Sequence, residues 1–165
     1  MYKISIANQC TSKCTRYLEE EKKMKKVAII YWSGTGNTEA MAKGIMEGAM
    51  KEDVNVKLIN VGNANEEDVL NADVIAFGCP SMGAEVLEES EMEPFIESIA
   101  NVVRGKNIVL FGSYGWGDGE WMTQWQDRME EYGANLLQEG LIINNDPDGE
   151  GIKKCKELGE LLSKA

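Results

Sequence analysis

The chain has 165 residues, enough for one domain with a substantial hydrophobic core. Its 28 acidic and 17 basic side chains give a formal net charge of −11, and it contains no histidine. Such a surface repels nucleic acid and anionic membranes, and the commonest general base and metal ligand is missing. Four cysteines are too few for a disulfide framework, and no apolar run could span a membrane. We therefore expect a cytoplasmic protein with neither nucleic acid nor membrane as a partner.

Residues 1–23 differ in character from the rest of the chain. They end in a charged run, lack the apolar core of a signal peptide, and precede Met24, which would itself serve as the start of a compact domain. Cys10 and Cys14 could in principle hold a metal or form a redox disulfide, but further ligands at a suitable spacing are missing. We expect residues 1–23 to be a flexible N-terminal extension, residues 24–165 to form the domain, and no metal to be bound.

Five apolar segments alternate with helical patterns from Val27 onward. The first, 27–32, is apolar throughout, which is typical of a strand buried on both faces of a parallel sheet. A helix is expected over 39–51, where apolar residues recur on one face. Further strands are expected at 54–61, 73–79, 107–111 and 136–143, and further helices from Asn65, from Pro94, over 120–132 and over 152–162. This alternation predicts an α/β fold of three layers, with a doubly wound five-stranded parallel sheet covered by helices on both faces.

The turn at residues 33–38, SGTGNT, follows the first strand and opens the first helix. The N–H groups at a helix start are unpaired and partly positive, the two glycines let the backbone curl, and the hydroxyls can donate to an anion. A Walker loop is excluded because there is no Lys or Arg over 27–42, and a dinucleotide fingerprint is excluded by Glu39, which stands where glycine is needed. The turn predicts a site for a monophosphate held by neutral donors. The alternative is a strand-to-helix turn that binds nothing.

Two other loops should meet this turn, because ligands of doubly wound sheets bind beyond the carboxyl ends of the strands. In the loop 113–120, Trp116 stands between glycines, so nothing near it in sequence can bury it, whereas Trp121 and Trp125 have the spacing of core residues. In the loop 80–85, Met82 offers a soft contact to an aromatic ring, and Gly83 permits peptide orientations that a side chain would forbid. Together the loops predict a site for a planar ring with a monophosphate tail.

Three segments in this order, YWSGTGNT, GCPSMGAE and FGSYGWGDGEWM, resemble the flavodoxin family. The resemblance covers residues 24–165 and, because no long insertion interrupts the fifth strand, it is to the short-chain kind. It implies a flavodoxin-like sheet with strand order 2-1-3-4-5 and an electron carrier with non-covalently bound FMN, without substrate turnover or catalytic residues. The cofactor-binding residues that it implies are Ser33, Gly34, Thr35, Gly36, Asn37, Thr38, Pro80, Ser81, Met82, Gly83, Ala84, Ser113, Tyr114, Gly115, Trp116, Gly117, Asp118 and Asn145.

The resemblance also implies roles within this set. Residues 33–38 would hold the phosphate, Trp116 and Met82 would cover the two faces of the ring, and the backbone of 113–115 would meet its polar atoms. The peptide after Met82 would turn its carbonyl toward the flavin as it gains a proton, which stabilises the semiquinone. Ala84 departs from the polar residue common in relatives and, if a positive φ is required there, should weaken that stabilisation.

Acidic residues gather in or beside the two ring loops: Glu85, Glu88, Glu89, Glu91, Glu93, Asp118 and Glu120. At an effective dielectric constant near 20, one charge about 8 Å from a reduced, anionic flavin raises its energy by roughly 2 kcal/mol before screening. We therefore expect a low-potential one-electron couple, although these acids could instead form a merely solvated face. The same acids should steer basic redox proteins to a monomeric carrier.

Three competing interpretations each conflict with features of the sequence. A response-regulator receiver needs paired acids after the first strand and an aspartate closing the third, but residues 31–33 and 78–80 read YWS and GCP. A flavin-dependent NAD(P)H:quinone or nitro reductase would need a nicotinamide site, for which neither an extra loop nor a basic patch is visible. A scaffold that has lost its flavin is disfavoured by the intact turn at 33–38 and by Trp116.

Overall fold

The computed structural model describes residues 23–165. The expected N-terminal extension, with Cys10 and Cys14, lies outside the described residues except for Lys23, so its flexibility stays a prediction. Within residues 23–165, no helix combines the length and the apolar character that crossing a membrane requires.

A parallel sheet forms the middle layer of the molecule. Its strands follow the order β2-β1-β3-β4-β5, with β6 also paired to β4, and every pairing is parallel. This confirms the expected order 2-1-3-4-5. The strands are β1 (Lys25–Tyr31), β2 (Val54–Asn60), β3 (Val74–Gly78), β4 (Asn107–Tyr114), β5 (Asn135–Leu136) and β6 (Leu141–Asn144).

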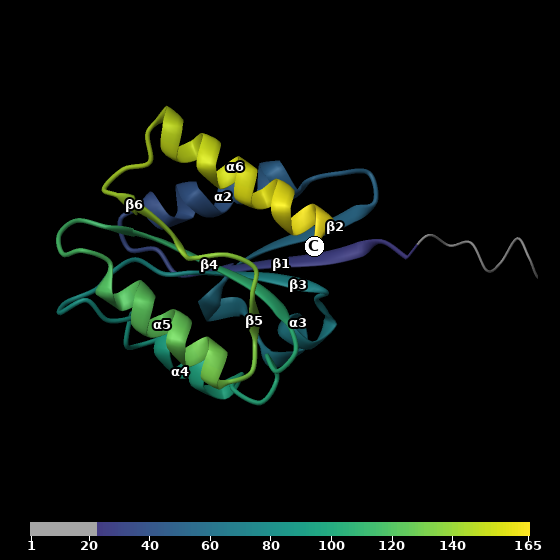
Figure 1. Ribbon diagram of the computed structural model, residues 1–165, viewed down its shortest axis with the longest axis horizontal. Coiled ribbons are helices and arrows are strands. Elements are labelled where there is room, and N and C mark those ends of the chain that lie inside the picture. Colours follow the sequence, from purple (N-terminus) through teal and green to yellow (C-terminus); the bar gives the residue numbers. More distant parts are fainter. Residues whose placement is uncertain (1–22) are drawn as a thin grey trace, which may run out of the picture.

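Helices cover both faces of the sheet, as Figure 1 shows: α2 and α6 lie on one face, and α3, α4 and α5 on the other. Successive residues of a buried strand point to opposite faces, so Ile29 belongs to the core under α2 and α6 while Ile30 belongs to the other core. Both side chains are fully buried. The helical segments are α2 (Asn37–Ala49), the 3-10 turn η1 (Val61–Asn63), α3 (Glu66–Asn71), α4 (Met92–Ser98), α5 (Glu120–Glu131) and α6 (Gly149–Lys164).

The last strand differs from its prediction. The sequence predicts one strand over 136–143, but the structure has two short strands, β5 and β6, that both pair with β4. Ile108 pairs with Leu136 and Phe111 with Leu141, so this segment uses two more residues than β4 between the same two pairings, and the surplus bulges out. The interruption is only residues 137–140, in keeping with the short-chain kind.

Other element boundaries shift by up to three residues from the predictions, and two of these shifts have a cause in the contacts. Helix α4 begins at Met92 rather than at Pro94, because the Glu88 carboxylate accepts the N–H groups that precede its first turn. Strand β4 continues to Tyr114 rather than ending at Phe111, because β6 pairs with its last residues. Ser113 and Tyr114, predicted as loop residues, are therefore strand residues with fixed backbone directions.

Candidate functional site

A cavity of about 300 Å³ opens at the carboxyl ends of β1, β3 and β4. The three loops predicted to meet do meet there, since residues from all three line this cavity. The lining residues are Trp32, Gly34, Thr35, Asn37, Pro80, Ser81, Met82, Ser113, Tyr114, Gly115 and Asn145. Apart from Trp32, every one belongs to the predicted site, and none carries a charged side chain.

The turn 33–38 wraps the start of α2. Gly36 is the N-cap residue with φ of +98°, a left-handed conformation that favours glycine. The Ser33 hydroxyl accepts hydrogen bonds from the N–H groups of Gly36 and Glu39, at 3.1 and 3.2 Å, so it caps the helix from within the turn. The N–H groups of Asn37 and Thr38 lie in the first turn of the helix. They have no partner within the helix, because no helical carbonyl group precedes them by one turn.

The three hydroxyls of this turn have different surroundings. Thr35 lines the cavity, whereas the buried Thr38 shares a hydrogen bond with Ser113, 3.0 Å between the two oxygens. The backbone N–H of Ser113 also donates to the Thr38 hydroxyl, at 3.4 Å. Thr38 therefore ties the turn to β4, and Thr35 is the hydroxyl on the cavity side.

The tryptophans divide as predicted. The Trp116 side chain is 66% exposed, while Trp121 and Trp125 are 1% and 2% exposed and belong to the core. Trp116 does not itself line the cavity but follows Gly115, which does. The indole of Trp116 is thus free to cover a flat ligand beside the cavity.

The loop 80–86 contains a tight turn. Met82 and Val86 exchange two backbone hydrogen bonds, at 2.9 and 3.0 Å, which close the three residues between them into a turn. Within it Gly83 has φ of +48° and Glu85 has φ of +55°, but Ala84 does not have a positive φ. In this conformation the left-handed backbone therefore falls on Gly83 and Glu85, not on Ala84.

Glu85 connects the two ring loops, a role that the sequence does not reveal. Its carboxylate accepts the N–H groups of Gly119 and Glu120 at the start of α5, at 3.1 and 3.2 Å. It also lies against Gly117, where an added Cβ would sit 2.4 Å from the Glu85 carboxyl carbon. Gly83, Ala84, Gly117 and Asp118 do not line the cavity, but Glu85 holds their two loops together.

Glu88, predicted among the acids beside the two ring loops, has a buried side chain. It is 7% exposed and accepts the N–H groups of Ser90, Glu91 and Met92 at 2.8–3.0 Å. Burial raises the pKa of the Glu88 carboxyl, but the N–H donors of Met92, Glu91 and Ser90 outweigh it, so the pKa lies below the ordinary value. The charged Glu88 carboxylate thus stabilises the start of α4.

Other predicted acids also have partners. Glu93 forms an ion pair with Arg128, 2.7 Å between nitrogen and oxygen, and Glu120 accepts a hydrogen bond from Gln124. Glu91 accepts a hydrogen bond from the Trp32 indole N–H at 2.9 Å. The acidic patch that the sequence predicts is therefore less open than its composition implies.

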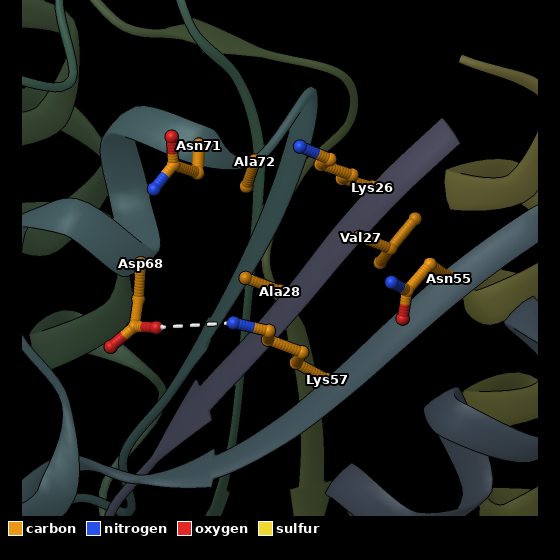
Figure 2. Close-up of a pocket in the computed structure, with 8 residues that line it drawn as sticks. All are labelled: Lys26, Val27, Ala28, Asn55, Lys57, Asp68, Asn71 and Ala72. Atoms are coloured by element: carbon orange, nitrogen blue, oxygen red, sulfur yellow. Dashed lines mark ion pairs between the residues drawn. The ribbon is translucent and has the colours of Figure 1, made fainter. Parts of the chain in front are cut away.

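A second cavity, of about 360 Å³, lies at the opposite end of the sheet, near the amino ends of β1 and β2 (Figure 2). Lys26 and Lys57 line it, and Lys57 pairs with Asp68 at 3.7 Å. No predicted site residue lies there, as expected for a sheet whose ligands bind at the carboxyl ends of the strands. Among residues 23–165, no group of three or more His, Cys, Asp or Glu side chains is arranged to hold a metal ion.

A doubly wound sheet with an uncharged, hydroxyl- and glycine-rich turn and a neighbouring exposed indole defines an α/β protein suited to a phosphorylated, planar cofactor. Residues 29–159 match the family model described as flavodoxin. Curated flavodoxins from Clostridium beijerinckii and Megasphaera elsdenii are 49% and 48% identical, over 82% and 84% of this chain and 97% and 99% of theirs. The solution structure of two-electron reduced Megasphaera elsdenii flavodoxin matches with a TM-score of 0.78 and 47% identity, over 84% of this chain and 99% of that one. The chain belongs to the flavodoxin family.

The cofactor is accordingly FMN, and the protein is an electron carrier rather than an enzyme with its own substrate turnover. The reductase considered from the sequence is not favoured. The residues at the cavity fit this cofactor, because its lining offers neutral hydrogen-bond donors and no cation, and its volume is at the lower end of the range for small-molecule sites.

Proposed function

We propose that FMN binds in the cavity at the carboxyl ends of β1, β3 and β4, with its phosphate at residues 33–38. The observation that carries this proposal is the convergence of three loops, far apart in sequence, on one cavity without charged side chains. Thr35, Asn37 and the free N–H groups of α2 are the neutral donors that suit a phosphate. The cofactor-binding set is the one predicted from the sequence, with Trp32 added as a wall of the cavity.

The ring lies between Trp116 and Met82 in this proposal. When bound, FMN supplies one-electron redox chemistry. The exposed Trp116 indole stacks on one face and excludes water, while Met82 packs its thioether on the other. The peptide after Met82 reorients to offer its carbonyl, which is feasible because Gly83 tolerates either sign of φ and has no atom near its Cβ position.

The proposed couple has a low potential because acidic side chains oppose the addition of negative charge. The exposed Glu89 and Asp118 are the main contributors. Glu85, Glu88 and Glu93 contribute less, since each is offset by N–H donors or by Arg128. The proposed partners are basic redox proteins that dock over these acids and over the exposed Trp116 and Val86. The carrier works as a cytoplasmic monomer.

The test compares FMN with riboflavin, which lacks the phosphate, on the apoprotein. Thr35→Ala should weaken FMN binding roughly tenfold, because one hydrogen bond to a charged group is lost, and leave riboflavin binding unchanged. Thr123→Ala, the same change on the exposed side of α5, is the control. Equal affinities of the wild type for FMN and riboflavin, measured by flavin fluorescence quenching, would contradict the phosphate site.

A further inference from the structure

We infer that Glu91 is a positioning residue for the phosphate turn and acts through the indole of Trp32. The inference rests on the phosphate site proposed above and adds a residue that lies outside the cavity lining. Glu91 belongs to the segment after β3, whereas Trp32 directly follows β1.

The Trp32 ring supports the turn from one side. It lies so close to Gly34 that a Cβ built there would be 2.9 Å from Cη2 and 3.1 Å from Cζ3. The φ of Gly34 is not in the left-handed region, so its backbone conformation does not require glycine. Glycine is needed there because a larger residue would meet the Trp32 ring. Since Trp32 also lines the cavity, its ring is both a wall of the site and a support for the backbone that faces the phosphate.

The hydrogen bond to Glu91 selects one orientation of this ring. The indole N–H is the only polar group of a tryptophan side chain, and it donates to Glu91 Oε2 at 2.9 Å. Torsion about χ2 of a tryptophan is roughly two-fold, so without this acceptor a ring flipped by half a turn would compete. A flipped ring would present a different edge to Gly34 and change the shape under the turn.

Glu91 is itself held from several sides. Its backbone N–H donates to the buried Glu88 carboxylate at 2.8 Å, and the N–H of Glu88 in turn donates to the Cys79 sulfur at 3.4 Å. Its other carboxylate oxygen, Oε1, would lie 2.8 Å from a Cβ at Gly62, in the turn after β2. Glu91 is thus hydrogen-bonded to Trp32 after β1 and to Glu88 after β3, and its carboxylate lies close to the turn after β2.

Positioning and simple electrostatics predict effects of opposite sign. Glu91 is a negative charge near the proposed phosphate, so removal of its charge alone would strengthen FMN binding. Removal of its acceptor oxygens would free the Trp32 ring and weaken FMN binding. Glu91→Gln removes the charge but keeps an acceptor, whereas Glu91→Ala removes both.

The experiment titrates each apoprotein with FMN and with riboflavin and follows the ratio of the two affinities. We expect Glu91→Ala to weaken FMN binding roughly tenfold, which corresponds to ~1.4 kcal/mol, and to change riboflavin binding less than about twofold. Glu91→Gln should restore most of the FMN affinity. Glu97→Ala is the matched control, because Glu97 is an exposed glutamate of the neighbouring α4 whose side chain makes no hydrogen bond or ion pair among the described residues.

A second variant keeps the inference falsifiable if Glu91→Ala folds poorly. Trp32→Phe removes the indole donor and leaves Glu91 in place, and it should lower the ratio of FMN to riboflavin affinity by a similar factor. The double variant should lose no more than either single one, because both break the same contact. An unchanged ratio in both single variants, or equal gains in affinity for Glu91→Ala and Glu91→Gln, would overturn the inference alone. A wild type that does not prefer FMN would overturn the phosphate site and this inference together.

Discussion

At the level of single residues, the carboxylates of the segment 85–93 have very different surroundings in the structure, although they are neighbours in the sequence. Glu88 is buried under three N–H donors, Glu91 accepts the Trp32 indole N–H, and Glu93 pairs with Arg128. These contacts stabilise the chain segment beside the proposed cofactor site.

Replacing Glu88 should destabilise the protein in a pH-dependent way. Its folded-state pKa lies below the ordinary value, so its stabilisation is complete above the unfolded-state pKa and is lost as the pH falls through the folded-state pKa. We expect Glu88→Gln to lower the free energy of unfolding by about 1–3 kcal/mol at pH 7 and by progressively less in acid. Urea unfolding at pH 7 and pH 3 measures this, with the exposed Glu89→Gln as control; equal losses for the two variants at pH 7 would contradict it.

Gly83→Ala tests the backbone of the turn 82–86 by itself. Gly83 has φ of +48° and no atom within 4 Å of a Cβ built there, so the substitution meets no steric contact. Left-handed backbone costs a residue with a Cβ about 1 kcal/mol, and the peptide after Met82 loses conformations. We expect the two one-electron midpoint potentials of the bound flavin to move closer together in a redox titration. An unchanged separation of the two potentials would show that the conformation of the peptide after Met82 does not affect them.

At the scale of elements, helices α2 and α6 are held together by close backbone contact. A Cβ at Gly159 would lie 2.0 Å from the Ile45 carbonyl oxygen, and a Cβ at Gly48 would lie 2.0 Å from the Lys156 carbonyl oxygen. Backbone atoms cannot yield as a flexible side chain would. The layer that covers β1 therefore depends on glycine at helix positions where propensity alone would favour alanine.

Gly159→Ala should consequently force the two helices apart. We expect a loss of about 2–3 kcal/mol in the free energy of unfolding, typical of overpacking. Gly149→Ala, at the open start of α6 with no atom near its Cβ position, is the control and should be neutral or stabilising. Thermal and urea unfolding of the two apoproteins compare them; equal stability would show that the helices can slide to accept the methyl group.

At the level of the whole molecule, acidic side chains prevail, with 28 against 17 basic ones. Glu89 and Asp118 are exposed beside the proposed ring loops, while Lys26 and Lys57 flank the cavity at the opposite end of the sheet. The net charge of −11 adds a general attraction for basic partners.

Asp118→Asn should make the bound flavin easier to reduce fully. Removal of one exposed, partly screened charge is expected to raise the lower midpoint potential by on the order of tens of millivolts. Asp127→Asn, an exposed change within α5 rather than in the ring loop, should shift it less. Spectroelectrochemical titration of the two variants gives the comparison, and equal shifts would assign the low potential to net charge instead of to local acids.

Electron transfer to a basic acceptor should slow steeply as salt is added. The carrier and a basic c-type cytochrome attract one another over distances comparable to the Debye length, about 8–10 Å at physiological ionic strength. Stopped-flow electron-transfer rates are measured over a span of ionic strength on the order of tenfold or more. As the salt concentration rises, the rate should fall for a basic acceptor and should not fall for an acidic one. Equal salt dependence for both acceptors would contradict steering by the acidic face.

Residue patterns alone predicted the parallel α/β fold, the edge of the sheet where the three loops meet and most of the residues around the cavity, whereas the strand order came from the resemblance to flavodoxins. These follow from local patterns, since buried strands, glycine-rich turns and helix starts are written in short segments, and a parallel sheet brings its carboxyl ends to one edge. Three features became visible in the folded chain alone: Trp32 meets Glu91, Glu85 caps α5, and the last strand divides into β5 and β6. In each case the partner is a backbone or side chain far away in sequence, and its position depends on how whole layers pack.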